Sequence, residues 1–168
     1  MQKSYITVQD TQSLRQLYDY INDNQIIALD TETTSLNPRK GKIVGWSVSA
    51  NEGEGFYLPT LVWDFKEESL KKQYINQTDT EKISRELMKM LVGKKLVTHN
   101  GSFDCRYIKH YYEVDLIPYI WVDTTLLVHT VQEEGAGMGN FQLKRIAVSI
   151  QEELGLDVEG QANEEQIV

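Results

Sequence analysis

The stretch over residues 26–36 limits most strongly how this chain can fold. Four apolar residues lead there directly into two acids separated by a threonine, Asp30-Thr31-Glu32. A short apolar run rich in isoleucine predicts a buried β-strand rather than a helix. Residues i and i+2 of a strand point to the same face, so Asp30 and Glu32 are expected to project side by side from the strand's end.

Two carboxylates placed this close together repel each other, at a cost of about 4 kcal/mol for a separation of 4 Å and an effective dielectric constant of 20. A hard divalent cation such as Mg²⁺ or Mn²⁺ would offset the repulsion, because these ions take oxygen ligands and assist phosphate chemistry. The alternative is a strand that runs out into a solvated acidic turn, since aspartate and threonine are common at strand ends.

The length of 168 residues and the net charge of −8 restrict the class of protein. The length suits one domain with a proper core. A general duplex-binding protein would carry a basic face, so the acidic balance argues against one, while a cleft that takes a strand end through metal ions stays open. The single cysteine, Cys105, excludes an intrachain disulfide and fits a reducing cytoplasm. Neither a signal peptide nor a membrane-spanning segment is recognisable, so we expect a cytoplasmic protein without a membrane partner.

The pattern of apolar residues and turn signals predicts alternating helices and strands. Helices are expected over 10–24, 79–92, 103–112, 123–132 and 141–154, and strands over 42–50, 55–59, 95–99 and 117–122 in addition to the central one. Residues 60–76 are expected to form a peripheral loop or short helix, with Trp63 and Phe65 as packing residues. The order predicts an α/β fold in which a mixed sheet, three antiparallel strands plus two further strands, is flanked by helices.

A second acidic position follows the strand at 95–99. That strand delivers Asn100 to a turn, and Asp104 lies in the first turn of the next helix. If the strand pairs beside the central one, Asp104 faces Asp30 and Glu32 across the strand ends, where ligands of such sheets gather. The alternative is that Asp104 only interacts favourably with the helix dipole.

Taken together, these two motifs are similar to those of a known enzyme family. Asp-Thr-Glu-Thr at 30–33 followed by Asn-x-x-Phe-Asp at 100–104 resembles the DnaQ-like 3′→5′ exonucleases. Asp-Thr-Thr-Leu-Leu at 123–127 and Phe-Gln-Leu-Lys-Arg-Ile-Ala at 141–147 look like stretches of the proofreading domain of family A (polymerase-I-type) DNA polymerases, particularly phage ones. The resemblance covers roughly residues 25–155. It implies a ribonuclease-H-like fold, a two-metal site for Mg²⁺ or Mn²⁺, and the single-stranded 3′ end of DNA as substrate. It also implies a monomer, attached to the remainder of a polymerase polypeptide and located in the host cytoplasm if a phage encodes it.

The resemblance further implies a role for each matching residue. Asp30 would bridge both metal ions, Glu32 would hold the ion that binds the attacking water, and Asp104 would help to hold the second ion. Further substrate-binding positions would be filled by Thr31, Leu36 as a wedge beside the terminal base, and Asn100 and Phe103 as walls of the strand-end pocket. Asp123 matches a position that is usually structural and caps its helix.

The sequence departs from the family pattern at the third motif, a Tyr-x-x-x-Asp on a helix after the stretch at 141–147. No tyrosine follows Tyr119. We therefore expect an exonuclease-like domain over 1–155, a poorly structured acidic tail over 156–168, and a chain that forms the N-terminal part of a longer protein and has little activity alone. Two alternatives remain, an RNase-D-like RNA exonuclease and a non-catalytic ribonuclease-H-like interaction module.

Overall fold

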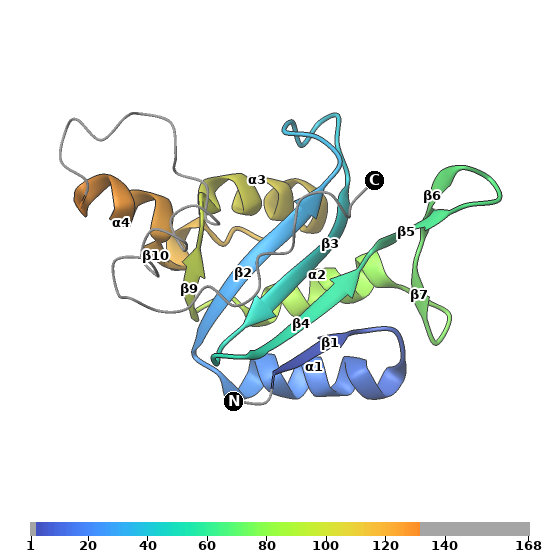
Figure 1. Cartoon of the computed structure of the whole chain (residues 1–168), viewed down its shortest axis with the longest axis horizontal. Coiled ribbons are helices and arrows are strands. Elements are labelled where there is room, and N and C mark those ends of the chain that lie inside the picture. Colours follow the sequence, from blue (N-terminus) through green and yellow to red (C-terminus); the bar gives the residue numbers. More distant parts are fainter. Residues whose placement is uncertain (1–2, 132–168) are drawn as a thin grey trace. The chain divides into compact units, whose positions relative to one another are not determined.

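The central feature of the fold is a six-stranded mixed sheet (Figure 1). The computed structural model describes residues 3–131, which belong to two compact units that divide after Asp123, and the sheet lies in the first unit. The strand order is β1-β4-β3-β2-β9-β10. These strands are β1 (Ser4–Thr7), β2 (Ile26–Thr33), β3 (Ile43–Ser49), β4 (Glu54–Pro59), β9 (Lys95–Thr98) and β10 (Ile120–Asp123).

Strand β2 occupies a central place and pairs differently on its two sides. It runs antiparallel to β3 and parallel to β9. Strand β4 continues the antiparallel part, while β1 and β10 add parallel strands at the two edges. The predicted mixed sheet of three antiparallel and two further strands is thus confirmed, with β1 as an addition that the sequence analysis did not predict. Most of β1 is exposed at the sheet edge, so its sequence carries no strong alternation of apolar and polar residues.

The helices of the first unit are α1 (Thr11–Asp23), α2 (Thr80–Met90) and α3 (Gly101–Tyr112), and the second unit contributes α4 (Thr124–Val131). Helix α1 starts with a capping box. The Asp10 carboxylate accepts the backbone N–H of Ser13 at 2.8 Å, and the Ser13 hydroxyl oxygen accepts the backbone N–H of Asp10 at 3.2 Å. Helix α2 packs against α1 and α3 and contacts β4. Within residues 3–131, no helix has the length and hydrophobicity needed to cross a membrane.

The hydrophobic core lies between the sheet and helices α1, α2 and α3 of the first unit. The indole N–H of Trp46 donates to the hydroxyl of Ser84 at 2.8 Å, so the one polar group of this buried ring is satisfied. The largest fully buried side chains are Trp46, Tyr107, Tyr112, Leu17, Ile21, Ile27, Leu58, Met88, Leu91, Leu96, Ile108 and Leu116.

The segment between β4 and α2 differs from its prediction. Instead of a loop or short helix it forms two hairpins, β5 (Leu61–Asp64) with β6 (Ser69–Lys72) and β7 (Tyr74–Ile75) with β8 (Thr78–Asp79). The prediction that Trp63 and Phe65 are packing residues is wrong, because they are 51% and 87% exposed. A two-stranded hairpin lacks a second layer that could cover them.

Two element boundaries also differ from the predictions. The strand predicted over 117–122 begins as a 3₁₀ turn (Ile117–Tyr119), since Pro118 has no N–H to donate to a sheet, and β10 starts only afterwards. Helix α3 begins two residues earlier than predicted, after Asn100, which adopts a left-handed conformation with φ of 58°. The predicted helix over 141–154 and the acidic tail lie outside the described residues.

Candidate active site

The candidate site is built on the second half of β2. Leu29 and Thr31 are buried, whereas Asp30 and Glu32 are exposed, as the alternation of a strand requires. Strand β3 accompanies β2 to its end, but β9 pairs with it only at Ile26, Ile27 and Ala28. Beyond Ala28, one side of β2 therefore needs another partner.

Asp104 of helix α3 supplies that partner. One oxygen of its carboxylate, Oδ1, accepts the backbone N–H of Thr31 at 3.0 Å and the Thr31 hydroxyl at 2.5 Å. A buried backbone N–H needs an acceptor, so Asp104 takes the place that a longer β9 would have filled. Strand β9 pairs beside β2, which is the condition on which the prediction for Asp104 depended.

Asp104 is only 2% exposed. Burial raises the pKa of its carboxyl to about 6; the two hydrogen bonds from Thr31 act against this rise, and the negative charge of Asp30 adds to it. Desolvation also raises the pKa of Asp30, the charge of Glu32 raises it further, and His99 opposes both. The site thus concentrates negative charge that nearby protein groups offset only in part.

The turn between β9 and α3 is held by Asp123 at the end of β10. Its two carboxylate oxygens accept the backbone N–H groups of Asn100 at 3.0 Å and Gly101 at 2.9 Å. The structure therefore gives Asp123 a structural contact at the start of α3, which the sequence analysis did not anticipate, while capping of its own helix stays a prediction. This contact fixes the position of Asn100, the first residue of the predicted pocket wall.

The other predicted substrate-binding residues lie close to these carboxylates in the chain, after β2 and in the first turn of α3. Leu36 is 87% exposed in the loop that follows β2. Phe103 is half-buried in the first turn of α3, and its ring centroid lies 5.2 Å from that of Tyr107. Thr31 is buried, and both its backbone N–H and its hydroxyl donate to the Asp104 carboxylate.

Tyr57 is a residue near the site that the sequence analysis missed. In the sheet register, Asp30 is opposite Ser47, and Ser47 is opposite Tyr57 on β4. Gly45, opposite Glu32, leaves space for the ring, since a Cβ at Gly45 would lie 2.3 Å from the Tyr57 hydroxyl oxygen. Burial and the charge of Glu32 raise the pKa of Tyr57. Only the strand register reveals this neighbour, and no local motif could have indicated it.

A model of the family described as 3′-5′ exonuclease matches residues 5–163, almost the whole chain. The chain belongs to this 3′→5′ exonuclease family. The family is related to the proofreading domains of polymerase-I-type enzymes. DNA polymerase I of Treponema pallidum is 37% identical to this chain over 60 residues, which are 36% of this chain and 6% of that protein. DNA polymerase I of Borreliella burgdorferi is 27% identical over 118 residues, which are 70% of this chain and 12% of that protein. The chain thus spans a small part of the length of these relatives.

Solved exonuclease structures share the ribonuclease-H-like fold of this family member. RNase D of Escherichia coli, described as an exoribonuclease involved in structured RNA processing, has a TM-score of 0.55 at 17% identity, with coverage of 90% of this chain and 34% of that one. Brucella melitensis NrnC bound to pGG has a TM-score of 0.53 at 17% identity, with coverage of 96% and 66%. At this identity the likeness concerns the fold alone.

Exonucleases of this family depend on divalent metal ions, and the donor chemistry of the site fits such ions. Asp30 and Glu32 offer exposed carboxylate oxygens on one face, and desolvation together with the charge of Glu32 raises the pKa of Asp30, so a bound cation would favour its ionised form. Within residues 3–131, however, no three His, Cys, Asp or Glu side chains converge closely enough to hold one ion. Of the Asp104 carboxylate, one oxygen is bonded to Thr31.

Proposed function

We propose that this chain removes nucleotides from the 3′ end of single-stranded DNA, as the proofreading domain of a polymerase polypeptide does. The observation that carries the proposal is the pair of exposed carboxylates, Asp30 and Glu32, at the end of the central strand with the buried Asp104 beside them. The kinship with DNA polymerase I sequences supports DNA as the substrate. The exonuclease domain is proposed to span residues 1–155, with one copy of the chain acting alone.

In this proposal Asp30, Glu32 and Asp104 would hold Mg²⁺ or Mn²⁺. When bound, the ions activate the attacking water and stabilise the leaving 3′ oxygen. Asp30 would contribute to both ions and Glu32 to the one nearest the water. The Thr31 hydrogen bonds fix one Asp104 oxygen, which leaves the second oxygen of that carboxylate for an ion.

The substrate would be held by groups around these carboxylates. Leu36 would lie beside the terminal base, and Asn100 and Phe103 would form the wall of the pocket. Because Asp123 fixes the backbone at Asn100, this wall is supported before substrate arrives. Such preorganisation lowers the cost of ordering the terminal nucleotide.

Two other functions have specific observations in their favour. The fold shared with RNase D is compatible with an RNA exonuclease. Within residues 3–131 no three potential ligand side chains are grouped closely enough to hold a metal ion, which is compatible with a non-catalytic interaction module. Both are distinguished from the proposed function by measurements of cleavage and of metal binding.

The first experiment compares degradation of 5′-labelled single-stranded DNA and RNA of the same sequence with Mg²⁺ or Mn²⁺. We expect a weak ladder that shortens from the 3′ end of DNA, lost in Asp30→Asn and kept in Asp19→Asn, which removes an exposed acid from α1. A ladder that persists in Asp30→Asn would show that the activity does not arise at this site. A ladder on RNA alone would favour the RNase-D-like function.

The second experiment measures Mn²⁺ binding by calorimetry, because metal binding can be detected even where cleavage is slow. Asp30→Asn and Glu32→Gln should each weaken binding at least tenfold, while Asp19→Asn should not. Absence of both cleavage and metal binding in the folded wild type would refute the exonuclease and support the interaction module.

A further inference from the structure

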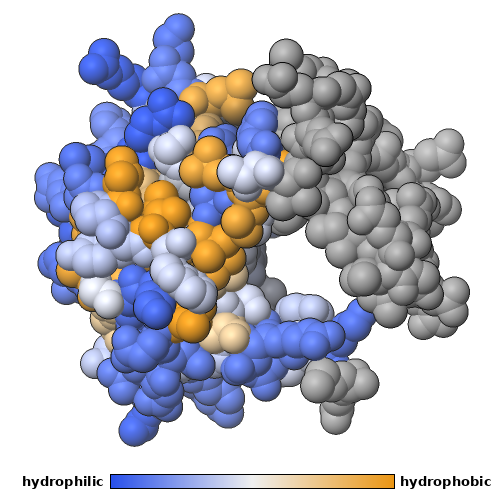
Figure 2. All heavy atoms as spheres, turned by 90° about the vertical axis from the view of Figure 1, so that its left-hand side faces the viewer, coloured by the Kyte–Doolittle hydropathy of each residue, from blue (hydrophilic) through white to orange (hydrophobic). Residues whose placement is uncertain are grey.

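The loop over residues 34–42, between β2 and β3, combines three bases with no acid. It contains Arg39, Lys40 and Lys42, all exposed, in a chain whose net charge is −8. The ion pairs formed within residues 3–131 involve none of these three side chains. Strongly hydrophilic side chains project at the top of Figure 2, the end at which Figure 1 places this loop.

Hydrogen bonds within the loop give it a defined shape. At its neck, the Thr34 N–H donates to the Lys42 carbonyl at 3.0 Å, and the Lys42 N–H donates to the Thr34 hydroxyl oxygen at 2.9 Å. At its tip, the Asn37 side chain accepts the Arg39 N–H at 3.0 Å, and the Asn37 carbonyl accepts the N–H groups of Lys40 and Gly41. An asparagine that binds its own backbone two residues on is typical of a tight turn.

Two tyrosines of α3 also hold the loop from below. The Tyr107 hydroxyl donates to the carbonyl of Ser35, and the Tyr111 hydroxyl donates to the carbonyl of Gly41. The two rings are stacked, with centroids 6.2 Å apart and an interplanar angle of 6°. Gly41 must be a glycine for this approach, since its Cβ would lie 2.3 Å from the Tyr107 hydroxyl oxygen. We call Tyr107 and Tyr111 the tyrosine clamp.

The loop begins at the acidic end of the site. Thr34 and Lys42 lie two strand pairs beyond Glu32, and at about 3.3 Å per residue the tip is roughly 10–20 Å from that carboxylate. A single strand whose 3′ end reached Asp30 and Glu32 would therefore pass the loop with its preceding phosphates. The acids at the site repel a polyanion, so a substrate needs compensating charge close by.

We propose that the loop over 34–42 is a preorganised phosphate-binding element for single-stranded nucleic acid, in which Arg39 and Lys40 contact the backbone and the tyrosine clamp keeps them in place. The proposal rests on the proposed function, because it extends that site along the strand. A loop that only joined two strands would need neither the clamp nor the uniform charge.

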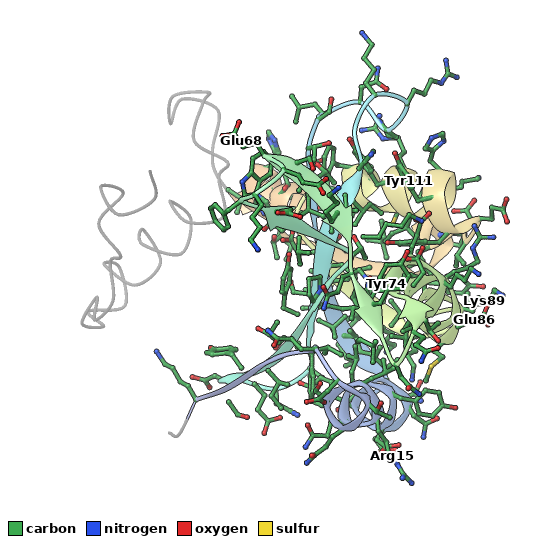
Figure 3. The ribbon with its side chains drawn as sticks, turned by 90° about the vertical axis from the view of Figure 1, so that its right-hand side faces the viewer. Arg15, Glu68, Tyr74, Glu86, Lys89 and Tyr111 are labelled. Atoms are coloured by element: carbon green, nitrogen blue, oxygen red, sulfur yellow. The ribbon has the colours of Figure 1, made fainter. Side chains whose placement is uncertain are left out.

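The test measures binding of a 5′-fluorescein-labelled oligothymidylate with a 3′-terminal phosphorothioate linkage to the full chain in Mg²⁺, by fluorescence anisotropy at several salt concentrations. Each phosphate contact to a single strand contributes about 0.7 to the slope of log affinity against log salt. Arg39→Gln combined with Lys40→Gln should therefore reduce the slope by about 1.4 and the affinity by about 25-fold at 0.1 M salt. The control is Arg15→Gln combined with Lys89→Gln, two bases that lie in the lower half of Figure 3, away from the loop, and it should change the slope little.

A second variant separates shape from charge. Tyr107→Phe combined with Tyr111→Phe keeps every base but removes both hydroxyl donors, so we expect weaker binding with an unchanged salt slope. Equal slopes for wild type and the Arg39/Lys40 variant would overturn the loop proposal; if degradation still depended on Asp30, the proposed function would stand. A slope reduced in the Arg39/Lys40 variant, in a protein that shows neither Asp30-dependent degradation nor Mn²⁺ binding, would support the loop as a strand-binding element and refute the exonuclease. A wild type that binds no oligonucleotide at low salt would overturn both.

Discussion

Replacement of Asp104 by asparagine should make the protein more stable at alkaline pH. The carboxyl is buried and its pKa is raised from an ordinary value of 3.8 to about 6, so its ionisation opposes folding. A group whose pKa is raised in the folded state stabilises most below its unfolded pKa, and this contribution is lost as the pH rises through the folded pKa. A difference of about two units corresponds to about 3 kcal/mol lost between pH 4 and pH 7.

Asparagine keeps an oxygen that accepts the two hydrogen bonds from Thr31 but cannot ionise. Its amide nitrogen needs a new acceptor, which offsets about 1 kcal/mol of the gain. We therefore expect Asp104→Asn to exceed the wild type by about 2 kcal/mol at pH 8 in EDTA and to fall to or below the wild type at pH 4.

Urea unfolding followed by tryptophan fluorescence from pH 4 to pH 8 measures this difference, since Trp46 is fully buried. Asp115→Asn is the matched control with the opposite sign. The hydrogen bond from Lys109 lowers the pKa of Asp115, so that variant should be less stable than the wild type at pH 8 and should approach it as the pH falls. A constant difference between Asp104→Asn and the wild type across this range would refute the reasoning. Addition of Mg²⁺ at pH 8 should stabilise the wild type more than Asp104→Asn.

Further predictions concern single contacts. Gly45→Ala should lower the unfolding free energy by about 1–3 kcal/mol, because the added Cβ meets the ring of Tyr57. In thermal unfolding, adding Tyr57→Ser to this variant should restore part of the lost stability, and an unchanged Tm in Gly45→Ala alone would contradict the prediction. Asp123→Ala leaves two backbone N–H groups at the start of α3 without this acceptor and should cost about 1–2 kcal/mol in urea unfolding, with a smaller cost for Asp123→Asn. Phe65→Ser should change stability by less than about 0.5 kcal/mol, since the ring is exposed, and a large loss would show that it packs. Burial raises the pKa of the Cys105 thiol to about 12, so the native protein holds almost no reactive thiolate at this position. A disulfide reagent should therefore modify Cys105 only at the rate of unfolding, and immediate modification of the native protein would refute this.

The sequence predicted those parts of the fold that depend on local pattern. The apolar run before Asp30 determined the central strand, and the helices predicted from residues 10 and 79 start within one residue of those positions, each capped by the aspartate found there. The approach of Asp104 followed from one further condition, that its strand pairs beside β2, which the register confirms. These features depend on residues close together in the chain or on one simple rule of sheet topology.

Other features depend on contacts that local sequence does not encode. The place of Tyr57 above Gly45 follows from the register of two strand pairs, and the exposure of Trp63 follows from the absence of a covering layer over its hairpin. Strand β1 is too short and too exposed to carry a pattern. The metal-binding and substrate roles of Asp30, Glu32 and Asp104 remain predictions.

The tyrosine clamp has a consequence for the order of folding. Its hydroxyls reach carbonyl groups 72 and 70 residues away in the chain, so the loop over 34–42 lacks these bonds until α3 has docked. Contacts of such large sequence separation form late, because the intervening chain must first lose its freedom. Amide hydrogens in the loop should therefore gain protection after those of α1, whose capping box joins residues only three apart in the chain. Substrate recognition in this protein would then be among the last properties to appear on folding and among the first to disappear when α3 is destabilised.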